Sequence, residues 1–317
     1  MNKAGNTVKN ETSDENSLLP CDVRPKTHIP GKTLNKIGVD QSGEVTYSFN
    51  RAGYRGEDFD PSAKLKICLI GESHAFGIGV DYSVTYGNKF KQHVAKALGE
   101  DEADINLINL AVGGSSADYC VRTLYRQISL IDVDLVICHI PSRDRIEYLG
   151  GKHPVSYQVA GANADKLEEM STPLLGYLDF YSPKVGLVNQ IKNALMVQDF
   201  LKRQKAGYIL LTGDMVRENT RLKLARPFAG QLDFRHVLRH SFFRQRADFA
   251  TDNRHAGARS HAAVAIALVN HYSRVLADQG DNNRANQIES YANTLMATDK
   301  DWAFCNEFVA RESAGTD

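Results

Sequence analysis

The sequence has no long run of apolar residues. None of its stretches approaches the roughly 18 consecutive apolar positions that a membrane-spanning helix needs. Residues 1–20 also lack the apolar segment, about 7–15 residues long, of a secretory signal. We therefore expect a cytoplasmic protein with no membrane partner.

Cysteine is scarce and scattered. The five cysteines are Cys21, Cys68, Cys120, Cys138 and Cys305, and they form no CxxC pair. An odd number at such wide spacing excludes a disulfide framework and a cysteine-based metal site. We expect no metal and no cofactor.

The chain has no excess of charge of either sign. Lys and Arg together number 38, and so do Asp and Glu, which gives a formal net charge of zero. This balance argues against a general nucleic-acid partner, although it allows a local basic patch. A chain of 317 residues with 42% hydrophobic residues can bury a sizeable core as one large domain or two small ones.

The composition changes along the chain. Residues 1–45 are polar and contain three prolines, so they are expected to form an extension with little to bury. Residues 43–50 alternate apolar and polar side chains, which predicts a short edge strand. The main domain is predicted over 46–278, and residues 279–317 form a polar C-terminal tail with a possible helix at 285–297.

Apolar strands alternate with helical segments across the main domain. Strands are predicted at 66–70, 105–110, 134–140 and 208–212, and helices at 84–98, 116–129, 184–205 and 261–277. Continuously apolar strands that alternate with helices indicate a parallel sheet covered on both faces. The predicted fold is a three-layer α/β/α sandwich with about five parallel strands in flavodoxin-like order, with 150–183 as an insertion over the sheet. In such a fold, ligands bind outside the carboxyl ends of the strands.

A serine follows the first of these strands, in the stretch Gly71–Gly79. Ser73 could be the N-cap of a helix, since serine is a favoured capping residue. It could also be a nucleophile, because serine hydrolases place their serine at the same junction. A phosphate-binding loop is disfavoured, because the lysine of that motif is missing and the glycine spacing differs from a dinucleotide fingerprint.

An Asp and a His stand three residues apart before the last predicted helix. Asp252 can fold back to accept a hydrogen bond from Nδ1 of His255, which leaves Nε2 free to take a proton from a serine. A DxxH sequence alone can equally be a surface loop. The two signals support each other, because both fall on loops where the predicted architecture places a site.

The ordered blocks resemble the SGNH (GDSL-type) hydrolase family. Its first block matches Gly71-Glu72-Ser73, its second matches the segment from Asn109 to Gly113-Gly114, and its last matches Asp252 and His255. The stretch 49–56 (FNRAGYRG) resembles a lead-in of bacterial members. The resemblance implies a Ser73–His255–Asp252 triad, with the backbone N–H groups of Ser73 and Gly114 in the oxyanion hole.

The chain departs from that family at two positions. Glu72 stands where the first block has Asp, and Arg143 stands where the third block has the Asn that donates to the oxyanion. A guanidinium is a charged, planar donor, so Arg143 could stabilise an oxyanion or hold a substrate carboxylate. It could instead pair with Asp144 or Glu147.

The resemblance implies a serine hydrolase that cleaves a carboxylic ester, with a small acyl group on a carbohydrate as the leading substrate class. One alternative is an acyltransferase that uses the same triad with a sugar hydroxyl as acceptor. The other is a binding or structural protein that keeps the fold but, with Arg143 in the third block, does little catalysis.

The segment 234–246 carries two further candidates. His236 and His240 would share one face of a helix and could hold a metal, although the Glu of an HExxH motif is absent. The arginines of this segment are either a solvated face or an anion-attracting rim; they are Arg235, Arg239, Arg244 and Arg246.

Overall fold

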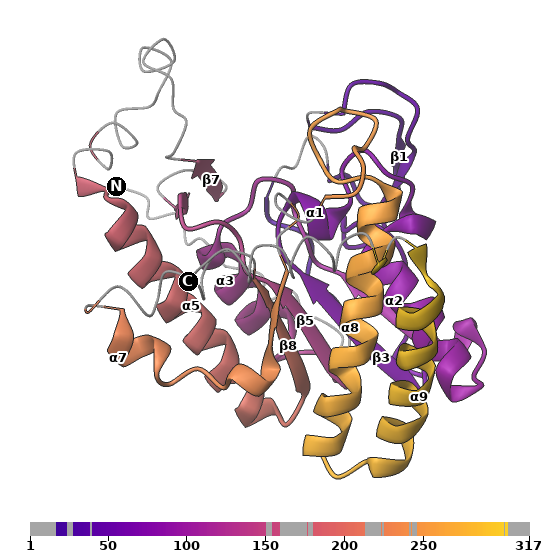
Figure 1. Ribbon diagram of the computed structural model, residues 1–317. Coiled ribbons are helices and arrows are strands. Elements are labelled where there is room, and N and C mark those ends of the chain that lie inside the picture. Colours follow the sequence, from indigo (N-terminus) through magenta and orange to yellow (C-terminus); the bar gives the residue numbers. More distant parts are fainter. Residues whose placement is uncertain are drawn as a thin grey trace, which may run out of the picture.

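The computed structural model describes residues 17–23, 28–38, 40–149, 154–158, 176, 180–212, 223, 225–240, 242, 246–300 and 302–303. Its centre is a parallel sheet of five strands in the order β4-β3-β5-β8-β9 (Figure 1). The strands are β3 (Leu65–Ile70), β4 (Ile105–Asn109), β5 (Leu135–His139), β8 (Gly207–Thr212) and β9 (Val237–Arg239). Numbered along the chain, the order is 2-1-3-4-5, which confirms the predicted flavodoxin-like arrangement.

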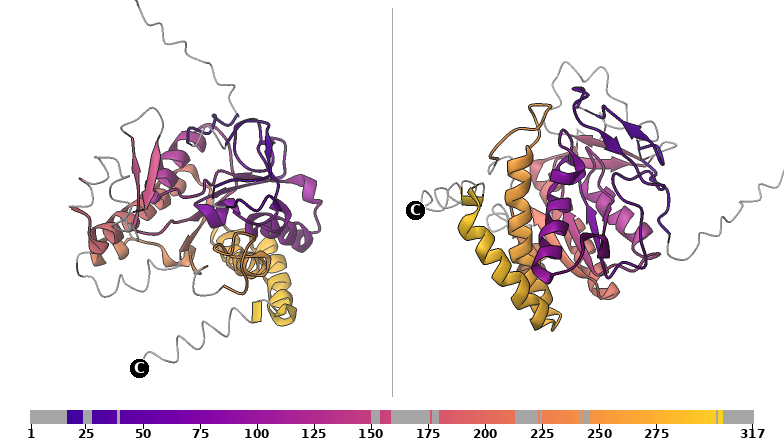
Figure 2. Two further views of the ribbon diagram at one scale, coloured as in Figure 1. Left: turned by 90° about the horizontal axis from the view of Figure 1, so that it is seen from above. Right: turned by 90° about the vertical axis from the view of Figure 1, so that its right-hand side faces the viewer.

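Helices cover both faces of this sheet. The long ones are α2 (Tyr86–Leu98), α3 (Ala117–Gln127), α5 (Pro183–Gln204), α8 (Ala258–Asp278) and α9 (Asn282–Thr298). In Figures 1 and 2, α3 and α5 lie on one side of the strands, while α2, α8 and α9 lie on the other. The predicted three-layer sandwich is therefore confirmed.

The strands are apolar throughout because each face meets a helical layer. Cys68 and Val136 belong to the apolar core that α3 and α5 share, whereas their neighbours Ile67 and Ile137 belong to the core shared with α2, α8 and α9. Alternate side chains of a strand point to opposite faces, so both sets are buried.

The helices begin and end at residues suited to those positions. Thr85 accepts a hydrogen bond from the backbone of Asn88 at the start of α2, and Gly99 ends that helix with a left-handed backbone. Ser116 and Ser182 cap α3 and α5 in the same way. A short polar residue thus begins each of these three helices.

Two further strands complete the comparison with the sequence predictions. The edge strand predicted at 43–50 is β2 (Tyr47–Ser48), which pairs with β1 (Thr33–Leu34) outside the main sheet. The fifth strand is β9, whose Leu210↔Val237 register extends the sheet beyond β8.

The remaining elements are short. They are α1 (Ser73–Phe76), η1 (Tyr82–Val84), η2 (Glu102–Asp104), α7 (Arg226–Ala229), η4 (Phe234–His236), β6 (Arg145–Tyr148) and β7 (Val155–Gln158). The antiparallel pair β6–β7 follows β5. Most of the predicted insertion at 150–183 lies outside the described residues.

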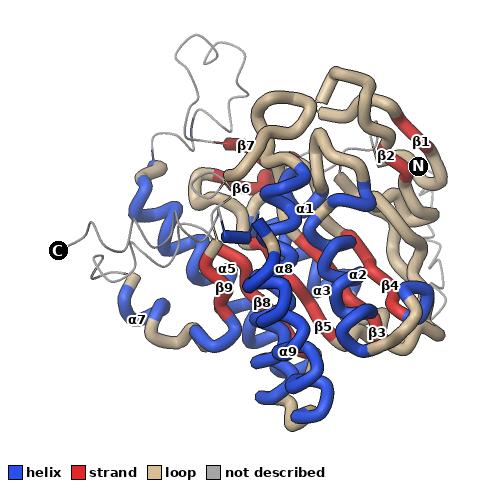
Figure 3. The backbone as a smooth tube through the Cα atoms, turned by 45° about the vertical axis from the view of Figure 1, so that its right-hand side comes forward, coloured by secondary structure: helices blue, strands red, loops and turns tan. Residues whose placement is uncertain are grey.

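The helix predicted in the C-terminal tail is α9. Its Ala285, Ile288 and Ala292 are buried in the core that α2 and α8 share, so α9 adds to the outer layer on that side of the sheet (Figure 3). In the part of the chain that the structure describes, none of the helices combines the length and apolarity needed to cross a membrane.

Candidate active site

The sequence-predicted site residues lie on loops at one edge of the sheet. The loop after β3 carries Ser73, the loop after β4 carries Gly114, the segment after β5 carries Arg143, and the chain returns after β9 to Asp252 and His255. Because all five strands are parallel, their carboxyl ends meet at this edge. The chain leaves β3 and β5 on opposite sides here, which is where ligands bind in open parallel sheets.

Ser73 opens the short helix α1 but does not cap it. The N-cap is Glu72, whose side chain accepts a hydrogen bond from the backbone N–H of His74 at 3.2 Å. The capping interpretation of Ser73 is therefore wrong. Its Oγ donates to Oε2 of Glu72 at 2.5 Å, and the side chain lies in a buried corner, with Ser73 only 4% exposed.

The loop before Ser73 passes close to the end of β5. A Cβ atom at Gly71 would stand 2.8 Å from Cβ of His139 and 2.9 Å from its carbonyl oxygen. Only glycine lets the two backbones approach this closely, which explains the first residue of the block.

The second block is held against the first. The carbonyl of Gly71 accepts hydrogen bonds from the backbone of Val112 at 3.1 Å and from Oγ of Ser115 at 2.8 Å. The Asn109 amide donates to a carbonyl of α1 at 3.2 Å. These bonds bring the turn at Gly114, which has a φ of 80°, beside the loop that carries the serine.

Asp252 and His255 are in direct contact. Nδ1 of His255 lies 2.5 Å from Oδ2 of Asp252, while Oδ1 accepts the backbone N–H groups of Arg254 and His255 at 3.0 and 2.9 Å. Burial alone would raise the pKa of Asp252, but these hydrogen bonds outweigh it and lower the pKa. The carboxylate is thus ionised at neutral pH, and Nε2 of His255 remains as the free acceptor.

His255 contacts the residue that follows Ser73 in the sequence. Its ring packs edge-on against the ring of His74, with the centroids 5.2 Å apart. Among the described residues, the hydroxyl of Ser73 bonds to Glu72, and no hydrogen bond joins it to His255. The structure therefore places Asp252 in contact with His255 and the ring of His255 against His74, while the hydroxyl of Ser73 faces Glu72.

A buried arginine that sequence reasoning did not single out supports the serine loop. Arg55, from the lead-in FNRAGYRG, is 0% exposed and donates to the carbonyls of Phe76 (2.9 Å), Gly77 (2.5 Å) and Val80 (2.8 Å). Burial lowers its pKa to about 10, so it keeps its charge at neutral pH. The lead-in resemblance thus has a physical basis: it supplies the cation that folds the loop after α1.

A second buried network joins the loop after α1 to the Asp–His loop. The phenol oxygen of Tyr47 accepts the N–H of Gly79 at 2.8 Å and donates to Asp40 at 2.6 Å. Thr251 donates to the same carboxylate at 3.1 Å, and its backbone N–H donates to the carbonyl of Gly79 at 3.1 Å. Tyr47 and Asp40 are far from Thr251 in sequence and form no recognisable motif with it, so only the structure identifies them as the connection.

Four buried histidine side chains surround Phe242, and one of them, His74, follows Ser73 in the sequence. His74 stacks on the Phe242 ring with centroids 4.5 Å apart, and the rings of His139, His240 and His261 lie within 5.6 Å of it. Burial lowers all four pKa values, to about 3 for His74 and His240. These histidines are neutral at pH 7.

The arginines after β5 occupy different places. Arg143 is half-buried, and its backbone carbonyl lies against α5 at Gly186. Arg145, two residues further on, reaches the serine loop, with Nη1 3.1 Å from Oε2 of Glu72. Of the acidic neighbours considered for Arg143, Glu147 pairs with Arg122 at 2.8 Å.

The segment with the histidine pair is not a helix. His236 ends the 3-10 turn η4, and the chain then extends as β9, so His236 and His240 do not share a helix face. Backbone pairing of Val237–Arg239 with β8 makes this segment a strand, although the two histidines have helical spacing. Nδ1 of His236 is bonded to the carbonyl of Tyr208 at 2.9 Å. The described residues contain no cluster of three or more His, Cys, Asp or Glu side chains placed to hold a metal ion.

The arginines of the same segment have separate surroundings. Arg235 pairs with Asp233 at 2.8 Å, and the guanidinium of Arg246 lies over the ring of Phe249 at 3.7 Å. Arg244 lies outside the described residues. The anion-attracting rim stays a prediction.

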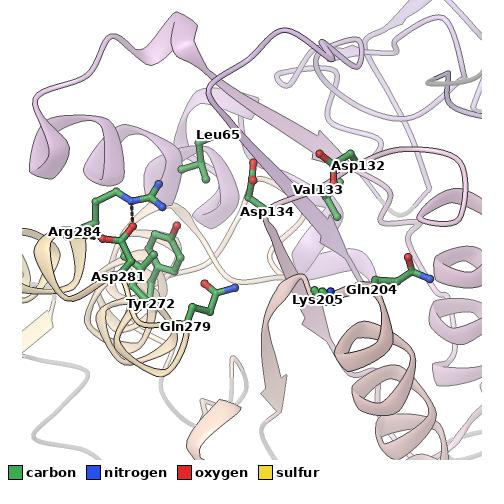
Figure 4. Close-up of a pocket in the computed structure, with 11 residues that line it drawn as sticks. Leu65, Asp132, Val133, Asp134, Gln204, Lys205, Tyr272, Gln279, Asp281 and Arg284 are labelled. Carbon is green, nitrogen blue, oxygen red and sulfur yellow. Dashed lines mark hydrogen bonds and ion pairs between the residues drawn. The ribbon is translucent and has the colours of Figure 1, made fainter.

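A polar pocket of about 440 Å³ lies at the opposite edge of the sheet (Figure 4). Its lining includes Leu65 at the start of β3, Asp134 just before β5 and Lys205 just before β8. Arg284 and Asp281, also in the lining, form an ion pair. The pocket is therefore at the amino ends of the strands, away from the loops that carry Ser73 and His255.

Comparisons with known proteins give likenesses in structure only. No protein-family model matches the chain, and no curated protein matches its sequence. Among solved structures it is similar to TesA, with 12% identity over 67% of this chain and 99% of that one and a TM-score of 0.43. It is also similar to the acetyl xylan esterase AlAXEase, with 16% identity over 64% and 98% of the two chains and a TM-score of 0.41.

A third likeness is to a protein of Desulfitobacterium hafniense that is described as lipolytic and of the G-D-S-L family. It has 15% identity over 67% of this chain and 100% of that one, with a TM-score of 0.34. The description of this last protein names the family that the sequence blocks resemble. At such identities and TM-scores the three structures do not decide what this chain does, so its chemistry is argued from its own residues.

Proposed function

We propose that the protein is a serine hydrolase that cleaves a carboxylic ester through Ser73, His255 and Asp252. The observation that carries this proposal is the contact of Asp252 with Nδ1 of His255, on a loop bonded to the loop that carries Ser73. A carboxylate at Nδ1 holds the imidazole in the tautomer whose Nε2 can take a proton.

The reaction begins when the Ser73 hydroxyl turns from Glu72 to Nε2 of His255. His255 takes the proton as Oγ attacks the ester carbonyl, and Asp252 stabilises the imidazolium that forms. His255 then gives the proton to the departing alcohol oxygen, which leaves an acyl group on Ser73. Water, deprotonated by His255, releases this acyl group as a carboxylic acid and restores the serine.

The negative oxygen of the intermediate would be met by backbone N–H groups of Ser73 and Gly114. Val112 and Ser115 donate hydrogen bonds to the carbonyl of Gly71, and these bonds hold the two loops side by side before substrate binds. Arg143 is the third donor in this proposal, in place of an asparagine. Each such donor contributes about 10²–10³ in rate.

A small acyl group on a carbohydrate is the proposed substrate class. The serine is 4% exposed and His74, beside it, is buried, and we infer from this enclosed position that the acyl group is short. The resemblance of the sequence blocks to SGNH hydrolases adds the carbohydrate portion to the proposal.

The test is covalent labelling of the nucleophile. A fluorophosphonate probe should modify the protein, and mass spectrometry should place the label on the peptide that contains Ser73. In parallel, p-nitrophenyl esters should be hydrolysed fastest when the acyl chain is short. Absence of both labelling and hydrolysis would favour a binding protein, whereas an acylated sugar formed from an added acceptor would indicate acyl transfer.

Asp252→Asn should lower kcat by about 10³–10⁴ at pH 7. The amide cannot stabilise the imidazolium, and its NH₂ group favours the wrong tautomer of His255. The measurement is p-nitrophenyl acetate hydrolysis at saturating substrate. Asp248→Asn is the matched control, because the Asp248 carboxylate accepts N–H groups at the start of α8. If both variants lose activity equally, the effect is on the loop and not on His255.

A further inference from the structure

The hydroxyl of Ser73 and the guanidinium of Arg145 meet at one oxygen atom. Oε2 of Glu72 accepts from Oγ of Ser73 at 2.5 Å and from Nη1 of Arg145 at 3.1 Å. The other oxygen of Glu72 accepts the backbone N–H of His74. The Glu72 carboxylate is thus placed between the candidate nucleophile and a cation.

This contact is buried and comes from a separate element. The side chains of Arg145 and Glu72 are 13% and 8% exposed. Arg145 belongs to β6, which is also anchored by the pair of Glu147 with Arg122 on α3. Nε of Arg145 is buried and has no hydrogen-bond partner among the described residues. Burying this guanidinium with Nε unpaired costs free energy of desolvation. Its position beside the candidate nucleophile indicates a functional reason for that cost.

Arg145 supplies the charge that faces Glu72. Burial raises the pKa of Glu72, whereas His74 on α1 and His139 at the end of β5 when protonated, Arg145 on β6, and the hydrogen bond from Ser73 lower it, and the net direction is downward. The two histidines have lowered pKa values and are neutral at pH 7. Of these described neighbours, Arg145 is therefore the one that is charged when the enzyme would work.

We propose that Arg145 is a positioning residue that acts through Glu72 on the hydroxyl of Ser73. This inference rests on the proposed function. With Arg145 in place, Glu72 stays ionised yet weakly basic, so it accepts the hydrogen bond of Ser73 without taking the proton and releases the hydroxyl to His255.

Removing Arg145 changes how Glu72 acts on the hydroxyl of Ser73, and the change depends on pH. Near pH 8 the buried carboxylate has no counter-charge, so it holds the serine proton more tightly and opposes the negative oxygen of the intermediate. At lower pH it takes up a proton and donates to Oγ of Ser73. Both states hinder attack, and the change between them introduces an ionisation that the wild-type protein lacks at these pH values.

The first measurement is the rate of fluorophosphonate labelling of Ser73 from pH 5.5 to 9. Arg145→Met should slow labelling about tenfold or more at pH 8, the factor that one unit of pKa represents, and should add an ionisation to the profile. Arg145→Lys should restore most of the rate because it returns the charge. Arg145→Met combined with Glu72→Gln should react faster than Arg145→Met alone, because the uncompensated carboxylate is gone.

Arg143→Met is the matched control. Because Arg143 is proposed as a donor to the oxyanion, Arg143→Met should lower the labelling rate by the same factor at every pH. The shape of its pH profile should therefore match that of the wild type. The proposal is overturned if Arg145→Met gives a profile of wild-type shape, or if adding Glu72→Gln brings no recovery.

The second measurement is the urea midpoint of unfolding, which does not depend on activity. In Arg145→Met the folded-state pKa of Glu72 rises above its unfolded value, so the native state binds more protons and becomes more stable as pH falls from 8 to 6. Relative to wild type, the midpoint deficit of Arg145→Met should shrink over that range. The midpoint deficit of the double variant should stay constant over the same pH range.

The two measurements separate the two proposals. If wild-type Ser73 is not labelled, the hydrolase proposal fails, while the urea midpoints still show whether Arg145 sets the charge of Glu72. If Ser73 is labelled but the deficit of Arg145→Met is independent of pH, the hydrolase proposal stands and the inference about Arg145 fails.

Discussion

Ser73→Ala is expected to abolish ester hydrolysis and fluorophosphonate labelling while the protein stays folded. Loss of the nucleophile of a serine hydrolase lowers kcat by about 10⁶, because no acyl-enzyme can form. The stability cost should be moderate, about 1.5–3 kcal/mol, as for one hydrogen bond to a charged group. Glu72 keeps its contacts with Arg145 and with the backbone of His74. The measurements are p-nitrophenyl acetate turnover and urea unfolding of both proteins.

Ser142→Ala is the control for this change. Ser142 lies on the same edge of the sheet, after β5, but its side chain is exposed. This variant should keep its label and its turnover. Hydrolysis by Ser73→Ala at the wild-type rate would contradict the proposed function outright, and unfolding of the variant would require Ser73→Cys as a second test of the nucleophile.

The protein is expected to lose much of its stability between pH 7 and pH 5. His74 and His240 have pKa values lowered to about 3 by burial, and His139 and His261 are lowered for the same reason. In the unfolded chain these groups take up protons near pH 6.5, whereas in the folded protein they do not. The unfolded state therefore binds more protons below pH 6.5, and stability falls as the pH falls.

The expected loss is about 2 kcal/mol for each histidine that stays neutral down to pH 5. Several such residues together remove a large part of the roughly 5–15 kcal/mol that stabilises a domain. Urea midpoints at pH 7.5, 6 and 5 measure the loss. His240→Phe, which keeps an aromatic ring beside Phe242, should make the decline less steep. Equal midpoints at pH 7.5 and pH 5 would show that the histidines titrate in the folded protein.

The sequence alone determined the layers of the fold and the loops that carry the site. Runs such as 67–70 and 135–138 are apolar at every position, so both faces of each strand are apolar. This pattern is typical of a parallel sheet that helices cover on both sides. Parallel strands then bring the loops after them to one edge. For this reason Ser73, Gly114 and the Asp252–His255 pair could be placed at one edge from local patterns.

The tertiary structure decided what those residues touch. The hydroxyl of Ser73 faces Glu72, and the guanidinium beside it belongs to Arg145, because the turn into β6 brings that residue to the serine loop. Residues Val237–Arg239 pair with β8 as a strand, and Phe234–His236 form a 3-10 turn before it, although His236 and His240 have helical spacing. Such choices depend on contacts between residues far apart in the chain, such as Thr251 with Asp40, and local spacing does not contain that information.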